Sequence, residues 1–205
     1  FTRATGHEAG KVGVPVPMFA AFGKEDEEQR AMSKQLNRLT SGTCAHGNAG
    51  EASYFLPLAD TKLKEGGRLA LIMPASLLAG EAWDKSRKLL RESYQELVVM
   101  TIAGCSDMES SFSADTGMGE CLLVATKRKR RLDHVDRNAP VRARFIVLRR
   151  RPETQLEAAE LARSIVSEIA SGSPRTIEDG PVGGDELHIG TEMLGTMIES
   201  PLPIE

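Results

Sequence analysis

The residues most able to bind a charged partner lie between Lys127 and Arg151. This stretch holds eleven Lys or Arg against two Asp, a net charge of +9, which leaves −12 for the rest of a chain whose total is −3. Such a concentration of cations predicts contact with a polyanion, and with nucleic acid in particular. The alternative is a solvated hairpin, whose charges keep the chain in solution and protect an edge strand from aggregation.

Zinc, nucleophile and phosphate-loop chemistries have little support in the sequence. The four histidines are scattered, without Cys or His partners at zinc-ligand spacing: His7, His46, His134 and His188. There is no G-x-S-x-G nucleophile turn and no Walker-type phosphate loop. The glycines of 116–119 precede a predicted strand instead of joining a strand to a helix, so we expect a turn there. Asp107 and Glu109 are interpreted as part of a solvated loop.

The elements that would position these residues alternate between helix and strand. Apolar residues at helical spacing predict helices over 25–40, 51–64, 81–94 and 152–171. Short, almost wholly apolar runs predict buried strands over 68–74, 96–102, 120–126 and 141–148. Residues 172–184 are predicted to be a linker, and the tail offers one short strand-like run over 185–191.

In the helix predicted for 152–171, Pro152 suits the first turn. The inward face is predicted to consist of Ala158, Ala162, Ile165, Val166 and Ile169. The predicted fold class is α/β, an open sheet that forms half of a doubly wound fold. The runs at 96–102 and 120–126 have no helix between them, so we expect them to form an antiparallel hairpin at the edge of the sheet.

Features of the whole chain indicate the cellular compartment in which it functions. Three cysteines, an odd number without a C-x-x-C pair, favour reduced thiols and a cytoplasmic protein. No apolar run is long enough to cross a membrane, and the first residues lack the apolar core of a signal peptide. Because the chain begins at Phe1 without an initiator Met, we expect a fragment of a larger protein.

Three segments resemble a known enzyme family. They are LKEGGRLALIMPASLLAGEAWDKSRKLL, FSADTGMGECLLVATKRK and the opening Phe1-Thr2-Arg3. The first segment resembles the fifth strand of that family's catalytic domain, with the helix that follows it. The second resembles the seventh strand with its preceding loop. The third resembles the residues directly after N-P-P in the family's catalytic N-P-P-aromatic tetrapeptide. The family is the S-adenosylmethionine-dependent adenine-N6 DNA methyltransferases of restriction-modification and phage-defence systems, and the resemblance covers residues 1–130.

The resemblance implies a half-domain with strands five, six and seven and their flanking helices. By resemblance, Phe1 would stack on the extruded adenine, and Phe112 would be a second aromatic against the same base, although Phe112 is equally interpretable as a core anchor for its loop. The family's Gly-rich turn and acidic cofactor residue have no counterpart here. We therefore expect S-adenosylmethionine to bind only the intact protein. The resemblance implies the missing amino-terminal half and a specificity subunit as partners.

DNA is the partner that the resemblance implies. The predicted DNA-binding residues are Arg3, Lys127, Arg128, Lys129, Arg130 and Arg131. Cations alternate along 127–131, so both faces of that segment carry charge and most of it is expected to contact solvent or phosphate. The predicted domains are a methyltransferase half over 1–130, a basic strand-helix extension over 131–171, and a linker and tail over 172–205.

Two other functions are compatible with the same residues. The chain could be a noncatalytic α/β module that holds nucleic acid through 127–151. It could also be half of a nicotinamide-dependent oxidoreductase, with 68–74 as one of its strands. The residues encoded before Phe1 would distinguish these, since G-x-G-x-x-G would support the oxidoreductase and N-P-P would exclude it.

Overall fold

The computed structural model describes residues 26–40, 42, 51–104, 111–113, 118–129, 142–171, 185–189 and 192–201. Its strands are β1 (Arg68–Pro74), β2 (Tyr94–Ile102), β3 (Glu120–Lys127), β4 (Arg142–Leu148), β5 (Asp185–Ile189) and β6 (Glu192–Pro201). Its helices are α1 (Asp26–Leu39), α2 (Phe55–Lys62), α3 (Asp84–Ser93) and α4 (Gln155–Ser171). Short 3-10 turns are η3 (Glu51–Tyr54), η4 (Ala75–Leu78) and η5 (Glu81–Trp83). The predicted α/β class is confirmed.

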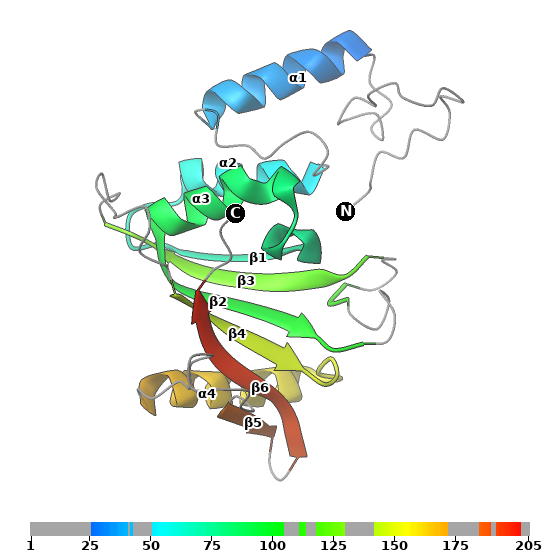
Figure 1. Cartoon of the computed structure of the whole chain (residues 1–205), viewed down its shortest axis with the longest axis vertical. Helices are drawn as coiled ribbons and strands as arrows, with labels where there is room; N and C mark the ends of the chain where they lie inside the picture. The colour runs from blue at the N-terminus through cyan, green and yellow to red at the C-terminus, as the bar shows by residue number, and fades with distance from the viewer. Residues whose placement is uncertain are drawn as a thin grey trace.

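The described strands form one mixed sheet in the order β1-β3-β2-β4-β6-β5 (Figure 1). Strand β3 is antiparallel to both β1 and β2, so β1 and β2 run in the same direction with β3 reversed between them. Strand β4 is parallel to β2. We call the end of the sheet where β1, β2 and β4 finish its carboxyl end, and the opposite one its amino end.

The predicted pairing of β2 with β3 is confirmed, but the prediction that this pair lies at the sheet edge is wrong. Strand β1 flanks β3, and β4 pairs with the other side of β2 from Leu97 opposite Ala143 to Ile102 opposite Leu148. The apolar residues of β4 extend the core sideways, because they continue the buried rows of β2. The basic stretch therefore includes a strand inside the sheet.

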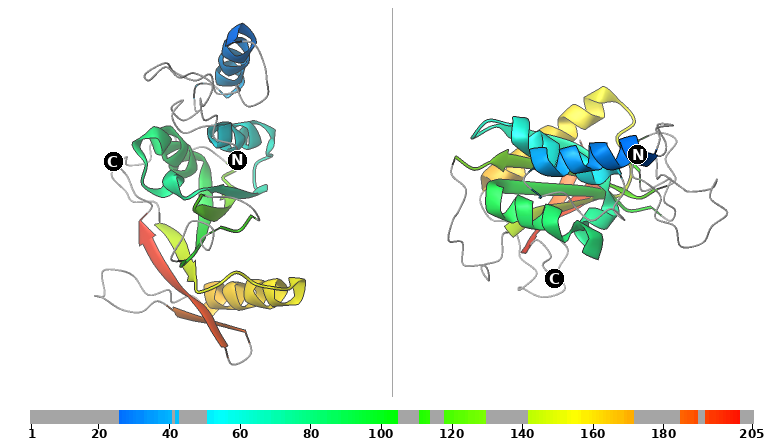
Figure 2. Two further views of the ribbon diagram at one scale, coloured as in Figure 1. Left: turned by 90° about the vertical axis from the view of Figure 1, so that its right-hand side faces the viewer. Right: turned by 90° about the horizontal axis from the view of Figure 1, so that it is seen from above.

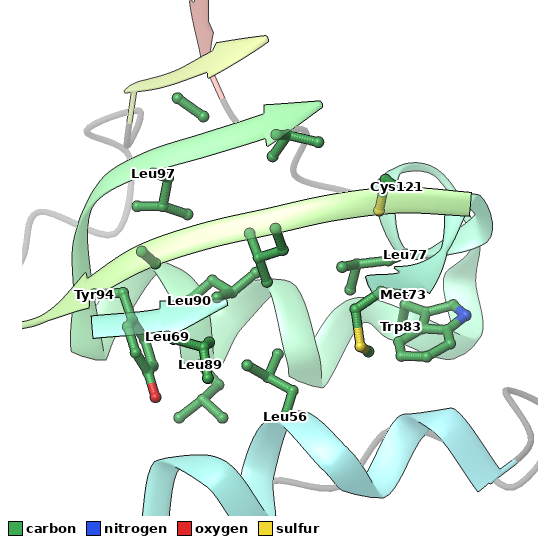
Figure 3. Close-up of a cluster of buried hydrophobic side chains, with 14 of the residues drawn as sticks. Leu56, Leu69, Met73, Leu77, Trp83, Leu89, Leu90, Tyr94, Leu97 and Cys121 are labelled. Carbon is green, nitrogen blue, oxygen red and sulfur yellow. The ribbon is translucent and has the colours of Figure 1, made fainter. Parts of the chain in front are cut away.

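Two apolar clusters lie on opposite faces of the sheet. Along β2, Leu97 and Val99 belong to the first cluster, while Met100 and Ile102 belong to the second. Alternate residues of a strand point to opposite faces, which accounts for this division. Helices α2 and α3 pack on the first cluster, where Leu56, Leu90 and Trp83 meet β1 and β3 (Figure 3). Each fully buried large side chain there contributes about 1.5–3 kcal/mol.

Helix α4 covers the second cluster, towards the other side of the sheet from α2 (Figures 1 and 2). Its predicted inward face is confirmed at Ile165, which is buried, and at Ile169, which packs against the cluster. It is wrong at Val166, which is 65% exposed, while Leu161 is buried instead. Ala158 and Ala162 are also exposed. Leucine and isoleucine one turn apart make a larger apolar contact than the predicted alanines, and this sets the rotation of the helix.

Helix α4 also begins three residues later than predicted. The Thr154 hydroxyl accepts a hydrogen bond from the Glu157 amide at 3.1 Å, and the Ala158 amide bonds to the Thr154 carbonyl. This is an N-cap, so Thr154 is the last residue before the helix and Pro152 lies outside it.

Strand β6 was not predicted from the sequence. Its residues, EMLGTMIESP, include a central glycine and few β-branched residues, which weaken the strand signal. The backbone at Gly195 lies against β4, where a Cβ atom would meet the Val147 carbonyl oxygen at 2.6 Å. The glycine therefore permits the close pairing of β6 with β4 and is part of the strand.

Helix α1 lies beyond α2, on the side away from the sheet (Figures 1 and 2). Its described contact with the rest of the chain is through Leu36, which packs with Leu58 against the buried Tyr54. Among the side chains that the structure describes, this contact forms a small cluster separate from the two main cores.

Candidate functional site

The loop that enters β3 lies at the carboxyl end of the sheet. Ligands of open α/β sheets bind at this end, beyond the carboxyl ends of the parallel strands. The Ser111 hydroxyl donates to the Met118 carbonyl at 2.8 Å. The amides of Phe112 and Ser113 both donate to Oε2 of Glu120, at 2.9 and 2.8 Å. Glu120 is 3% exposed, so a buried carboxylate closes this loop onto the start of its strand.

Phe112, predicted from sequence to contact a base, is partly buried and packs against the second apolar cluster. The ring therefore has a core contact, which matches the interpretation as a loop anchor. It also keeps some exposure at the carboxyl end of the sheet. The structure gives Phe112 a fixed place there, through both its side chain and its backbone amide.

The segment after β1 lies beside this loop. The Ala75 amide donates to the Gly119 carbonyl at 2.9 Å, which joins the two segments directly. Ser76 accepts a hydrogen bond from the Trp83 indole at 3.0 Å, and its carbonyl accepts one from the Gly80 amide. A Cβ at Gly80 would lie 2.9 Å from the Ser76 carbonyl oxygen, so this glycine serves the packing of the segment.

A buried arginine on α3 holds the segment that follows β1. Arg87 on α3 is 3% exposed, and its Nη1 donates to the carbonyls of Leu77 and Gly80 at 3.1 and 2.9 Å. Its Nη2 forms an ion pair with Asp84. Two loops at the carboxyl end are thus each fixed by one buried charged side chain, Arg87 for the segment after β1 and Glu120 for the segment before β3.

At the amino end, the predicted DNA-binding residue Lys127 is directed towards α2. Its ammonium group bonds to the carbonyls of Asp60 and Leu63 and lies 3.1 Å from Oδ1 of Asp60. The Tyr94 hydroxyl donates to the same carboxylate at 2.9 Å. A cation at the carboxyl-terminal carbonyls of a helix is a favourable arrangement. Lys127 therefore fastens α2 to the sheet.

The other predicted DNA-binding residues differ in exposure. Lys129 is exposed, while Arg128 is partly buried and its amide donates to the Ser93 carbonyl at 2.8 Å. Four predicted site residues lie outside the described residues: Phe1, Arg3, Arg130 and Arg131. The described part of the basic run is thus brought to the amino end, where it does not meet Phe112.

The two predicted parts of the site are far apart. Strand β3 has eight residues between Glu120 and Lys127. At about 3.3 Å per residue, its ends are about 23 Å apart. Phe112 and the described residues of the basic run, 127–129, therefore do not line one pocket.

The end of the basic stretch returns to the carboxyl end. Arg149 and Arg151 are exposed there, next to the end of β4. Arg150 forms ion pairs with Glu157 and Glu192, at 3.2 and 3.0 Å. These hydrogen bonds hold the pKa of the Glu157 carboxyl below its usual value and raise the pKa of Arg150. Within this arginine cluster, Arg150 is thus paired with one carboxylate of α4 and one of β6.

Sequence reasoning missed Glu120 and the Asp60–Tyr94 pair. A glutamate that opens the apolar strand ECLLVATK was the available signal, because a charged residue at the start of a buried strand needs a partner. Burial, together with the nearby Glu120 charge, raises the pKa of the Cys121 thiol to about 12. Burial and Asp60 raise the pKa of Tyr94 as well. Both groups thus stay neutral near pH 7.

Two further features concern the described residues only. No three His, Cys, Asp or Glu side chains cluster in these ranges so as to hold a metal ion. No helix found in the same ranges is long and apolar enough to cross a membrane.

Comparison with known proteins gives no family. No protein-family model matches the chain, and no curated protein matches it. Among solved structures, the modification subunit of a putative type I restriction enzyme from Vibrio vulnificus YJ016 is 18% identical, with a TM-score of 0.42. The alignment covers 58% of this chain and 25% of that one.

Two DNA-bound structures are similar at the same level. The ATP-dependent type ISP enzyme LlaBIII bound to DNA is 15% identical with a TM-score of 0.39, and the alignment covers 56% of this chain and 8% of that one. The DrdV–DNA complex is 14% identical with a TM-score of 0.41, over 62% of this chain and 13% of that one. The chain thus spans a quarter or less of these proteins. Likenesses at such identities and scores assign neither a family nor an activity.

Proposed function

We propose that this chain is the carboxyl-terminal half of the catalytic domain of an adenine-N6 DNA methyltransferase of a restriction-modification or phage-defence system. The complete protein would transfer a methyl group from S-adenosylmethionine to the N6 amine of an adenine extruded from the duplex. The observation that carries the proposal is the half-buried Phe112, on a loop closed by three hydrogen bonds at the carboxyl end of parallel strands.

The order of the strands supports the proposal. If β1 and β3 correspond to strands five and seven, as the sequence resemblance implies, β2 is strand six. The seventh strand then lies reversed between the fifth and the sixth. The antiparallel pairing of strands six and seven is the one expected from the sequence.

An aromatic ring at this place has a definite use in the proposed reaction. Extruding a base costs a few kcal/mol of lost stacking. A ring that stacks on the extruded base returns about 1–3 kcal/mol, and a fixed loop does so without further ordering cost. We propose Phe112 for this role, with Phe1 on the other side of the base.

Among the residues that the structure describes, the strand-to-helix junction does not fit the methyl donor. The described strand that leads directly into a helical turn, β1 into η4, has the sequence Pro74-Ala75-Ser76 at that junction, without the glycines that a nucleotide-like group requires. The nearest glycine, Gly80, is occupied by its packing on Ser76. We therefore propose that the preceding half of the protein binds S-adenosylmethionine and that this chain alone does not.

DNA contacts would come from both ends of the sheet. The exposed Lys129 and the neighbouring Arg128 would contact backbone phosphates at the amino end of the sheet, about 23 Å from the end that carries Phe112. We propose the same role for Arg130 and Arg131, which follow in the sequence. Arg3 would do so near Phe1. Such contacts position the duplex, and a separate specificity subunit would then read the sequence.

A second function is kept because one observation favours it. Lys129 is exposed and belongs to a stretch of net charge +9, which is sufficient for a noncatalytic nucleic-acid-binding module. Such a module would bind DNA through the amino end of its sheet, and its function would not depend on Phe112. The two functions therefore differ in their response to a change at the carboxyl end.

The test uses the complete polypeptide, tritiated S-adenosylmethionine and DNA, with the methylated nucleoside identified by mass spectrometry. We expect N6-methyladenine, and a rate about 10- to 100-fold lower for Phe112→Leu, which removes the aromatic face but keeps apolar packing. The control is Phe145→Leu, at a residue of similar burial in the middle of β4. Equal rates for the two variants, or no methyl transfer by the natural protein, would overturn the proposal.

A further inference from the structure

We infer that Glu120 is a positioning residue that holds the Phe112 loop in the orientation needed for the extruded base. The inference rests on the function proposed above. It assigns a task to a buried carboxylate that neither the sequence pattern nor the family resemblance singled out.

Between described residues, the hydrogen bonds of the Glu120 side chain are made with the loop. One oxygen, Oε2, accepts the two consecutive amides of Phe112 and Ser113 at 2.9 and 2.8 Å. Two adjacent donors on one oxygen fix the local backbone direction, and that direction sets where the Phe112 side chain leaves the chain. A bond from an amide to an ionised carboxylate is about twice as strong as one to a neutral oxygen.

The burial of the Glu120 carboxylate costs free energy, which the hydrogen bonds to the loop offset. A carboxylate that is 3% exposed has lost its water and requires donors from the protein. None of the ion pairs between described residues includes Glu120, so the two loop amides are the donors that the structure gives it. An apolar residue at this strand position would pack without that cost.

Glu120 also stands where two loops meet. It pairs with Pro74 in the register of β1 and β3, and the adjacent Gly119 carbonyl accepts the Ala75 amide at 2.9 Å. The segment after β1 is itself held by Arg87. Glu120 therefore ties the aromatic loop to the most firmly braced part of the carboxyl end.

Three variants separate positioning from folding. Glu120→Gln keeps the shape and one acceptor oxygen, and Glu120→Ala removes every acceptor. The matched control is Glu96→Gln, at an exposed strand residue near the amino end whose carboxylate accepts the Thr126 hydroxyl. If Glu120 positions the loop, the alanine variant is impaired more than the glutamine variant, and the control is unaffected.

The decisive measurement is a double-mutant cycle in the complete polypeptide. We expect Glu120→Gln to lower the single-turnover methylation rate about tenfold in the natural protein. We expect less than about a twofold change when Phe112 is already leucine, because residues that act through one another are not additive. An equal loss in both backgrounds, or no loss in either, would overturn the inference.

A second measurement does not depend on activity. Hydrogen exchange on the chain itself should show the amides of Phe112 and Ser113 exchanging at least about tenfold faster in Glu120→Gln than in Glu96→Gln. Unchanged exchange would overturn the inference even if the enzyme is active. Faster exchange with no methyl transfer by the natural protein would support the contact and contradict the proposed function instead.

Discussion

Glu120 and Lys127 stand at the two ends of the same strand, and each directs its charge into the protein. At the amino end, Lys127 binds the last carbonyls of α2 and so holds a helix. At the carboxyl end, Glu120 binds two amides of a loop and so holds an aromatic side chain near the surface. The same physical device thus serves packing at one end and the presentation of a side chain at the other.

This difference changes the interpretation of the basic run. From sequence, Lys127 was one of five consecutive cations assigned to DNA. In the structure its ammonium group is occupied by α2, and the neighbouring Lys129 is exposed. A run of like residues therefore does not share one role, because strand alternation and the position of the nearest helix end decide each residue separately.

The largest effect on stability is expected for Arg87→Ala at the carboxyl end. The change leaves the buried carbonyls of Leu77 and Gly80 without this donor, which we expect to cost about 2–4 kcal/mol. Urea unfolding measures it, with the exposed Lys88→Ala one residue away as the control, expected to change stability by less than about 0.5 kcal/mol. A loss below about 1 kcal/mol for Arg87→Ala would show that the carboxyl end is not braced as described.

The next effect is expected for Lys127→Met at the amino end. Methionine keeps the aliphatic stem but loses three contacts of the ammonium group, so we expect a loss of about 1–3 kcal/mol in the free energy of unfolding. Lys129→Met should leave stability unchanged.

DNA affinity should follow the opposite order for these two lysines. We expect Lys129→Met to weaken DNA binding and to reduce the slope of log K against log salt by about 1. Lys127→Met should alter neither quantity. The division of roles would be refuted by a Lys127→Met protein of normal stability with impaired DNA binding.

A smaller effect is expected for Tyr94→Phe. The hydroxyl donates to Asp60, and its removal should cost about 1 kcal/mol. Because Tyr94 and Lys127 share the Asp60 carboxylate, the double variant Tyr94→Phe with Lys127→Met should lose less than the sum of the two single losses. Strict additivity in thermal unfolding would mean that the amino-end contacts are independent.

The smallest effect concerns pH and the Arg150–Glu157 pair near the carboxyl end. The folded pKa of Glu157 lies below its value in the unfolded chain, so its contribution is present above the unfolded pKa of about 4.5 and is lost as pH falls through the folded pKa. Glu157→Gln should therefore flatten the acid side of the stability profile, relative to Glu160→Gln on the same helix. Identical acid limbs for the two variants would argue against the pair.

The sequence predicted most of the fold because its signals are local. The apolar run RLALIMP is β1 at the predicted bounds, and the break at 65–67 correctly separates it from α2. Strand β6 was missed because Gly195, which reads as a strand breaker, is needed for the close approach to Val147. The predicted rotation of α4 about its axis was wrong because Val166 and Leu161 are similarly apolar. Only contact with the sheet distinguishes them.

The candidate site was predictable only in part. Phe112 was predicted from the family resemblance, and its place at the carboxyl end follows from the strand order. The role of Glu120 depends on hydrogen bonds to residues seven and eight positions earlier, whose loop geometry is not encoded in a periodic pattern. The inward direction of Lys127 likewise depends on where α2 ends, far away in the sequence.

The most direct test of the account compares two DNA duplexes bound to the complete polypeptide. One contains the site whose adenine the enzyme methylates, and the other lacks that site. Hydrogen exchange should show that residues 111–113 are protected only by the duplex with the site, because a base contact is specific. Residues 127–129 should be protected by both duplexes and lose that protection as salt is raised. Equal behaviour at 111–113 with the two duplexes, or site-dependent protection confined to 127–129, would contradict the assignment of base contact to the carboxyl end.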